Sequence, residues 1–159
     1  GRGGIVVAAP PWAAAQLADL AAVIDAWADE QAGNPVVAAV ERSTPGEHRW
    51  FIRVTGDEKS VFSVWFWLEQ RTLHVETYVM PAPEEQRDRV FEYALRRNAR
   101  LEGLSFAIGP EDGLYLMGRV PLAQVDHAEL DRLLGAAYMV TESCFRTLMR
   151  LGFASKFTG

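Results

Sequence analysis

Apolar residues recur along this chain with two different periods, one typical of helices and one of strands. From Trp12 to Ala32 the spacing is helical, which predicts a helix with an apolar inner side. Four strand-like segments follow: Val36–Glu41, Arg49–Thr55, Val61–Glu69 and Thr72–Met80. Turn residues separate these segments about every ten positions, so an antiparallel meander is expected.

The second half of the chain adds two helices and a hairpin. Helical spacing predicts a helix over Pro83–Glu102, and Leu104–Ile108 with Leu114–Val120 form a hairpin around residues 109–113. Asp126 and Glu129 have the spacing of a capping box at the start of a helix that Gly152 ends. The order α-β-β-β-β-α-β-β-α predicts an α+β fold with three helices and a mainly antiparallel sheet, because strands and helices do not alternate.

The segment Val61–Leu68 departs from the pattern of a strand with one face in water. It reads VFSVWFWL, so large apolar side chains point to both sides of one strand. Two explanations remain open: helices of the same chain cover both faces, or the second face binds another molecule. The candidate partner contacts are Trp65, Trp67, Tyr78 and Met80, with Arg119 adding polar recognition, because most of these residue types are enriched in interface cores.

Length and composition narrow the classes of function. With 159 residues we expect a flexible N-terminal segment over residues 1–10 and a single domain over residues 11–157. The net charge of −5 disfavours a nucleic-acid partner, which would require a basic face. No apolar run approaches the roughly 18 residues of a membrane span. The one cysteine precludes an internal disulfide, which fits a reducing compartment.

The sequence carries no catalytic signature, so we expect no enzymatic activity, no metal and no cofactor. His74 and Glu76 face the same side of a strand, but no spacing supplies a third metal ligand. Cys144 falls on the inner side of the last helix, where packing is its expected role. A small-ligand site or an enzyme built from His74, Glu76 and Arg119 remains the alternative.

Three phrases of the second half resemble the YbjN family, whose members are described as bacterial sensory transduction regulators. They are LRRNARLEGLSFAI, GLYLMGRVPL and ELDRLLGAAYMVTESCFRTLMRLGF, and the resemblance extends over about residues 12–157. It implies a fold similar to that of type III secretion chaperones, in a small, cytoplasmic, non-enzymatic bacterial protein. It also implies a homodimer that holds an extended stretch of a client protein, and it transfers no catalytic residues.

These observations together predict a chaperone-like protein-interaction or regulatory module that binds a peptide or protein through a hydrophobic sheet face. A purely structural homo-oligomer subunit, in which every aromatic residue belongs to a core, is a further alternative. The two readings differ in what the second face of Val61–Leu68 contacts.

Overall fold

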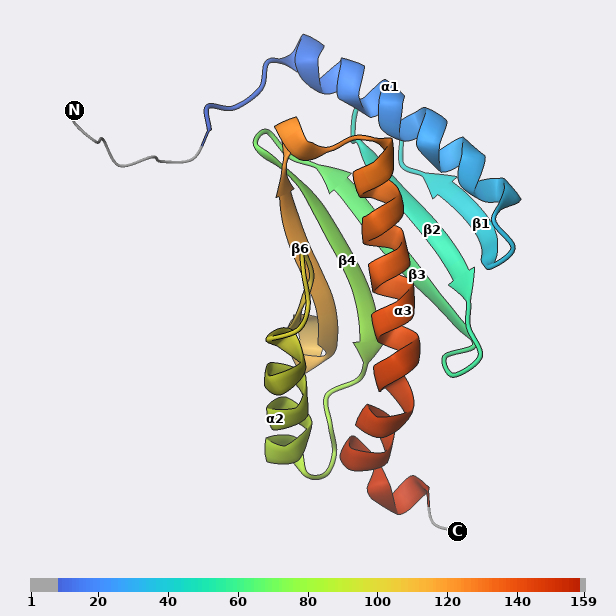
Figure 1. Ribbon diagram of the computed structural model, residues 1–159, viewed down its shortest axis with the longest axis vertical. Coiled ribbons are helices and arrows are strands. Elements are labelled where there is room, and N and C mark those ends of the chain that lie inside the picture. Colours follow the sequence, from blue (N-terminus) through green and yellow to red (C-terminus); the bar gives the residue numbers. More distant parts are fainter. Residues whose placement is uncertain (1–8, 158–159) are drawn as a thin grey trace, which may run out of the picture.

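The computed structural model describes residues 9–157, which form one six-stranded antiparallel sheet and three helices (Figure 1). The helices are α1 (Ala14–Glu30), α2 (Arg87–Asn98) and α3 (His127–Gly152). The strands are β1 (Val37–Arg42), β2 (Arg49–Thr55), β3 (Val61–Leu68), β4 (Thr72–Met80), β5 (Ser105–Ile108) and β6 (Leu114–Pro121). The α+β class and the order of the elements are as predicted.

The strands lie in the order β1-β2-β3-β4-β6-β5, so β3 and β4 occupy the centre of the sheet. The segment expected over residues 1–10 lies outside the described residues except for its last two, and the single domain over 11–157 stays a prediction. Short 3₁₀ turns complete the described chain, at Gln31–Gly33, Pro110–Asp112, Leu122–Gln124 and Ala154–Lys156.

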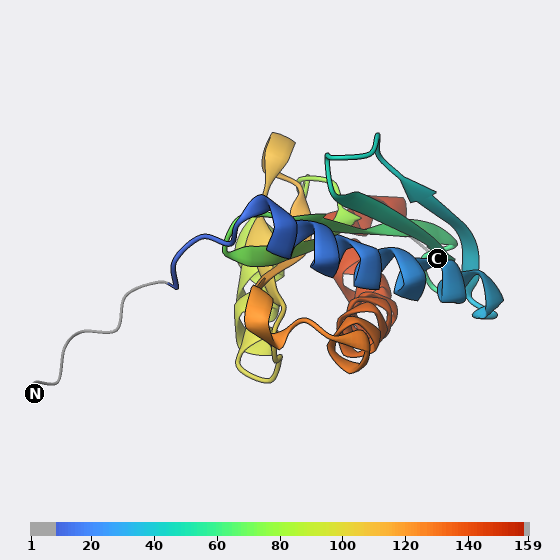
Figure 2. The ribbon, with the colours of Figure 1, turned by 90° about the horizontal axis from the view of Figure 1, so that it is seen from above.

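The helices pack on one face of the sheet. Figure 2 shows α2 and α3 on the same side, and in Figure 1 α3 runs along the central strands while α1 crosses one end of the sheet. The core residues of β2 and β3 alternate along each strand and all face these helices: Trp50, Ile52, Val54, Phe62, Val64, Phe66 and Leu68. One face of the sheet therefore supplies the hydrophobic core.

Trp27 joins α1 to the sheet and to α3. Its side chain is fully buried, and its ring meets Phe66 of β3 edge-on at 5.2 Å between centroids. The indole Nε1 donates a hydrogen bond to Asp131 Oδ1 of α3 at 2.9 Å. A buried indole needs such a partner, so this one residue satisfies both packing and polar requirements where three elements meet.

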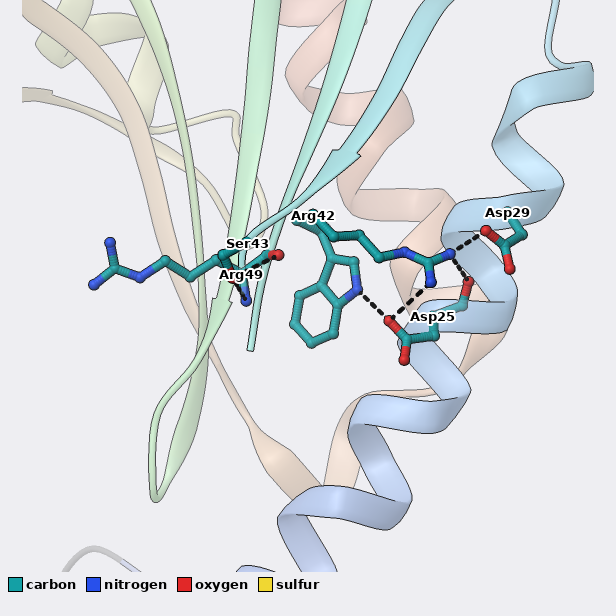
Figure 3. Close-up of polar contacts among 6 residues, drawn as sticks. Asp25, Asp29, Arg42, Ser43 and Arg49 are labelled. Carbon is teal, nitrogen blue, oxygen red and sulfur yellow. Dashed lines mark hydrogen bonds and ion pairs between the residues drawn. The ribbon is translucent and has the colours of Figure 1, made fainter. Parts of the chain in front are cut away.

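A polar cluster anchors α1 to the first hairpin (Figure 3). Asp25 Oδ1 accepts a hydrogen bond from Trp50 Nε1 at 2.8 Å and lies 3.6 Å from Arg42 Nη1. Arg42 also donates to the Asp25 carbonyl at 3.2 Å and pairs with Asp29. Arg49, in contrast, extends away from this cluster toward the other side of the sheet.

Helix α2 is shorter than predicted at both ends. Its N-terminus is set by tertiary contacts, because the backbone N–H groups of Glu84 and Glu85 donate to the Gly152 carbonyl at 3.0 and 2.9 Å. At the other end, the Asn98 side chain accepts from Phe106 N at 2.7 Å and donates to Phe106 O at 3.2 Å. The Pro83–Glu102 boundaries were wrong because these partners, Gly152 and Phe106, lie outside the helix.

The start of α3 is only partly as predicted. Asp126 Oδ1 accepts a hydrogen bond from the Glu129 N–H at 2.8 Å, which confirms Asp126 as the N-cap. The Glu129 carboxylate pairs with Arg132 at 2.6 Å instead of returning to the backbone of Asp126. The helix therefore has an N-cap and an ion pair in its first turn, in place of a reciprocal capping box.

His127 should make the protein less stable as pH rises above neutrality. The hydrogen bond between its Nε2 and Glu30 Oε2, at 2.5 Å, raises the pKa of the exposed imidazole. The folded pKa exceeds the unfolded pKa of about 6.5. The contribution of His127 to the free energy of unfolding is therefore fully present below about pH 6.5. It is lost as pH rises through the pKa of the folded state.

The measurement is the urea concentration at the midpoint of unfolding, for the wild type and for His127→Gln. It is repeated between pH 5.5 and 9 at intervals of about half a pH unit. The difference between the two proteins should shrink as pH rises. A difference that is constant, or that grows with pH, would contradict this assignment. Comparing the two proteins cancels the titration of His74, whose pKa burial lowers.

Candidate partner-binding face

The face of the sheet opposite the helices is here called the open face. Its central residues come from four neighbouring strands and are Arg49, Phe51 and Arg53 of β2, Ser63, Trp65 and Trp67 of β3, His74, Glu76 and Tyr78 of β4, and Tyr115, Met117 and Arg119 of β6. Trp65 is 44% exposed and Tyr78 is 42% exposed. Among the described residues, no helix covers this face, so the alternative of two covered faces does not hold there.

The strand register places Trp65 at the centre of one row across the open face. Phe51 of β2 lies on one side of it and Glu76 of β4 on the other. The Phe51 and Trp65 rings meet edge-on, at 4.8 Å between centroids and an angle of 83°. Such pairs are held together by ring electrostatics as well as by burial. The contact with Phe51 therefore orients the Trp65 ring, while 44% of the residue remains exposed.

A second row runs through Arg49, Trp67, His74 and Arg119. The Trp67 and His74 rings stack in parallel, at 3.8 Å between centroids and an angle of 15°. Trp67 is half-buried and Arg119 is exposed. The register therefore brings Trp65, Trp67 and Arg119, three of the predicted partner contacts, onto one surface.

His74 lies beneath Trp67 and is only 5% exposed. Both ring nitrogens are buried and lack hydrogen-bond partners among the described residues, and Glu76 Oε1 is 3.4 Å from Nε2. Burial lowers the pKa of His74, which favours the neutral ring at pH 7. The stacked Trp67 ring covers one face of the imidazole.

Tyr78 and Tyr115 extend the aromatic surface toward β5. They are cross-strand partners with ring centroids 5.3 Å apart. Burial raises the pKa of both phenols, so both remain protonated and able to donate hydrogen bonds at pH 7. The exposed part of Tyr78 thus offers an apolar ring with a polar tip, the combination that interfaces favour.

Met80 does not lie on the open face, so its predicted placement there is wrong. The β4–β6 register shifts between Tyr78 and Met80, and Met80 is fully buried against the helices. Lys59 Nζ donates to the carbonyls of Tyr78 and Val79 at 2.6 and 3.0 Å, which satisfies backbone groups of this irregularity. A shift of one position turns the following side chain to the other face.

The sequence analysis did not single out several residues of this face, among them Arg49, Arg53 and Tyr115. The turn between β2 and β3 could have predicted the position of the two arginines. Once Thr55 is placed opposite Val61, the antiparallel register also places Arg49 opposite Trp67. The β5–β6 hairpin similarly fixes Tyr115 beside Ala107, but its pairing with Tyr78 requires knowing that β6 joins β4. That crossover is a tertiary feature.

Neither a metal-binding cluster nor an exposed cysteine lies in the part of the chain that the structure describes. Residues 9–157 contain no group of three or more His, Cys, Asp or Glu side chains that could hold a metal ion. Cys144 is fully buried beside the core of α2 and α3, where packing was its predicted role. No helix within residues 9–157 is long and apolar enough to cross a membrane.

Two grooves lie beside helices, away from Trp65 and Tyr78. One, of about 270 Å³, lies between α1 and the β1–β2 hairpin and includes Asp25, Arg42 and Trp50. The other, of about 390 Å³, is almost wholly apolar and lies between α2 and β5, beside the exposed side chains of Leu95 and Ile108. The second groove is a competing candidate for an apolar contact.

The chain belongs to the YbjN family, described as "Putative bacterial sensory transduction regulator", which it matches over residues 20–150. The resemblance found in the sequence is thereby confirmed. A relative in Mycobacterium leprae, an uncharacterized protein, is 35% identical over 107 residues. That alignment covers 67% of this chain and 58% of the relative, so the chain spans less than two thirds of that protein.

Solved structures share the fold at low identity. The ExsC–ExsE complex contains a chain that matches with a TM-score of 0.59 at 17% identity, covering 83% of this chain and 95% of that one. A chain of the HopA1–SchA chaperone–effector complex matches with a TM-score of 0.58 at 10% identity, and the match covers 86% of this chain and 99% of that one. The structure of the Yersinia pestis type III secretion chaperone SycH, in complex with a fragment of YscM2, matches with a TM-score of 0.51 at 15% identity. The match covers 77% of this chain and 97% of that one. The predicted chaperone-like fold is confirmed.

Proposed function

We propose that this protein is a non-enzymatic protein-interaction or regulatory module that binds an extended segment of a partner protein on the open face. The observation that carries the proposal is the pair of exposed aromatic rings, Trp65 and Tyr78, on a sheet face that no described helix covers. Large apolar patches seldom remain bare in a folded protein, and tryptophan and tyrosine are frequent hot spots of binding.

The comparisons support a protein partner without identifying it. The similar chains of known structure occur in complexes with a second protein, among them the HopA1–SchA chaperone–effector complex. A shared fold does not transfer a client, so the partner of this chain is inferred from its own surface. The cytoplasmic location expected from the sequence stays a prediction.

A homodimer is the second candidate, favoured by the apolar groove between α2 and β5. Leu95 and Ile108, which flank it, are 68% and 54% exposed. The most common oligomer is an isologous dimer, in which both copies use the same patch. Self-association through this groove would leave the open face available for a client. The small-ligand alternative at His74, Glu76 and Arg119 is disfavoured, because the imidazole nitrogens are buried.

Site-specific photo-cross-linking tests the proposal. A benzophenone amino acid at position 65 or 78 should capture a second protein in bacterial cells. The same group at Met139, which is 65% exposed on α3, should not. Capture only from Leu95, yielding a second copy of this chain, would favour the structural homo-oligomer. Capture from Met139 alone would contradict the choice of face.

A further inference from the structure

We propose, building on the function proposed above, that the open face recognises an extended acidic segment of its partner. In this segment one apolar residue lies between two acidic residues, each two positions away from it. The acidic side chains would pair with Arg49 and Arg53, and the apolar side chain would rest on Phe51 and Trp65.

The geometry of β2 sets the spacing. Arg49, Phe51 and Arg53 alternate along one strand and face the same side, with the two arginines about 13 Å apart at roughly 3.3 Å per residue. A segment lying along this strand also points every second side chain at the sheet. An acidic–apolar–acidic pattern at every second position therefore matches the surface in either chain direction.

The two arginines of β2, Arg49 and Arg53, have no ion-pair partner among residues 9–157. Both are exposed. Arg42 shows the contrast, because Asp25 and Asp29 hold it on the side of α1 (Figure 3). A free guanidinium beside an aromatic ring is suited to bidentate pairing with a carboxylate.

The aromatic side chains of β3 complete the surface. Trp65 lies beside Phe51 and Trp67 lies beside Arg49, so apolar rings alternate with the two positive charges. The exposed edge of Trp65 offers the contact area that one leucine or phenylalanine of a partner would bury. Charge then selects the segment, while ring contact supplies most of the affinity.

A protein segment fits this surface better than a nucleic acid. The chain as a whole carries a net charge of −5, which opposes the approach of a long polyanion. Glu76 borders Trp65 on the open face, Glu41 of β1 lies opposite Phe51 on the same face, and Glu69 lies 3.8 Å from Arg119. A short segment can place its two carboxylates at Arg49 and Arg53 and an apolar side chain at the level of Glu41, whereas a long polyanion would carry further negative charges against these acidic groups.

Two synthetic fluorescent peptides of identical composition test the inference. The first has two glutamates placed two positions either side of a leucine, in a serine/threonine background, and the second has the same residues with the glutamates adjacent. The first should bind wild-type protein at least about tenfold more tightly in fluorescence anisotropy, as about 1.4 kcal/mol corresponds to tenfold. The advantage should shrink as salt is added.

Charge reversal provides the matched control. Arg49→Glu with Arg53→Glu should abolish the preference and should instead bind a peptide with lysines in place of the glutamates. Arg89→Glu with Arg100→Glu, which makes the same change in net charge at the exposed surface of α2 and the turn after it, should leave binding unchanged. If the reversed pair fails to fold, as judged by circular dichroism, Arg49→Gln with Arg53→Gln replaces it.

The outcomes separate this inference from the function on which it rests. Equal binding of both peptides, lost in Trp65→Ala, would overturn the acidic pattern and keep the open face as the binding surface. No binding of the first peptide would overturn the inference, leaving the proposed function to be decided by cross-linking. Tighter binding of single-stranded oligothymidine than of the first peptide, lost on charge reversal, would overturn it in favour of a nucleic-acid ligand.

Discussion

Replacing Trp65 with alanine is expected to weaken binding of the cross-linked partner by at least about thirtyfold, which corresponds to a hot-spot loss of about 2 kcal/mol. The ring is 44% exposed at the centre of the open face, so a partner can bury surface there that the free protein leaves in water. The same exposure limits its contribution to folding, and we expect the free energy of unfolding to fall by about 1 kcal/mol or less.

Adding Trp67→Ala should weaken binding further, for a different reason. Trp67 covers His74, so its removal both deletes a contact and exposes an imidazole that lacks hydrogen-bond partners. Isothermal titration with the purified partner measures the affinity, and Met139→Ala on α3 is the control, because it removes an exposed apolar side chain from the helical side. Affinity within twofold of wild type in both tryptophan variants would contradict the assignment.

Trp27→Ala should cause the largest loss of stability, about 3–5 kcal/mol. The substitution leaves a cavity where α1, β3 and α3 meet, and it also removes the indole that donates to Asp131. Urea unfolding measures the change. Val23→Ala is the control on the same helix, because Val23 is 45% exposed and should cost about 0.5 kcal/mol or less.

The Trp27 variant also separates folding from binding. Since Trp27 lies on the helix side of the sheet, the folded fraction of the variant should retain the affinity of the wild type for the partner. A loss of stability below about 1 kcal/mol would mean that the site collapses around the cavity or that α1 is not anchored there.

The strands of the central sheet were readily predicted from the sequence. The bounds of β2 and β4 agree with those expected, because alternation over seven or more residues between clear turns leaves few alternatives. The N-cap of α3 was also predictable, since the hydrogen bond of Asp126 reaches only three residues along the chain. These features depend on local chemistry, which a single sequence records directly.

The features that the sequence did not reveal depend on partners outside the helix or strand concerned. Met80 was placed on the wrong face because the irregularity before it involves β6 and the side chain of Lys59. Helix α2 ends at Asn98 because that side chain pairs with the backbone of Phe106 across a loop. Neither contact leaves a periodic signal in the residues that it changes.

The candidate site was predicted in part. Apolar residues on both sides of β3 indicated that its second face had a special role, but periodicity alone could not decide between a covering helix and an outside partner. The structure places Trp65, Trp67, Tyr78 and Arg119 on an uncovered face, and it adds the arginines of β2. Whether this face binds a partner stays a prediction.

Fluorine NMR of protein labelled with 5-fluorotryptophan tests that central claim most directly. The chain has five tryptophans, of which Trp27 and Trp50 are buried on the helix side while Trp65 and Trp67 lie on the open face. Titration with the partner should shift or broaden the signals of Trp65 and Trp67 and leave those of Trp27 and Trp50 in place. Saturated binding with the Trp65 and Trp67 signals unchanged would show that the partner binds elsewhere.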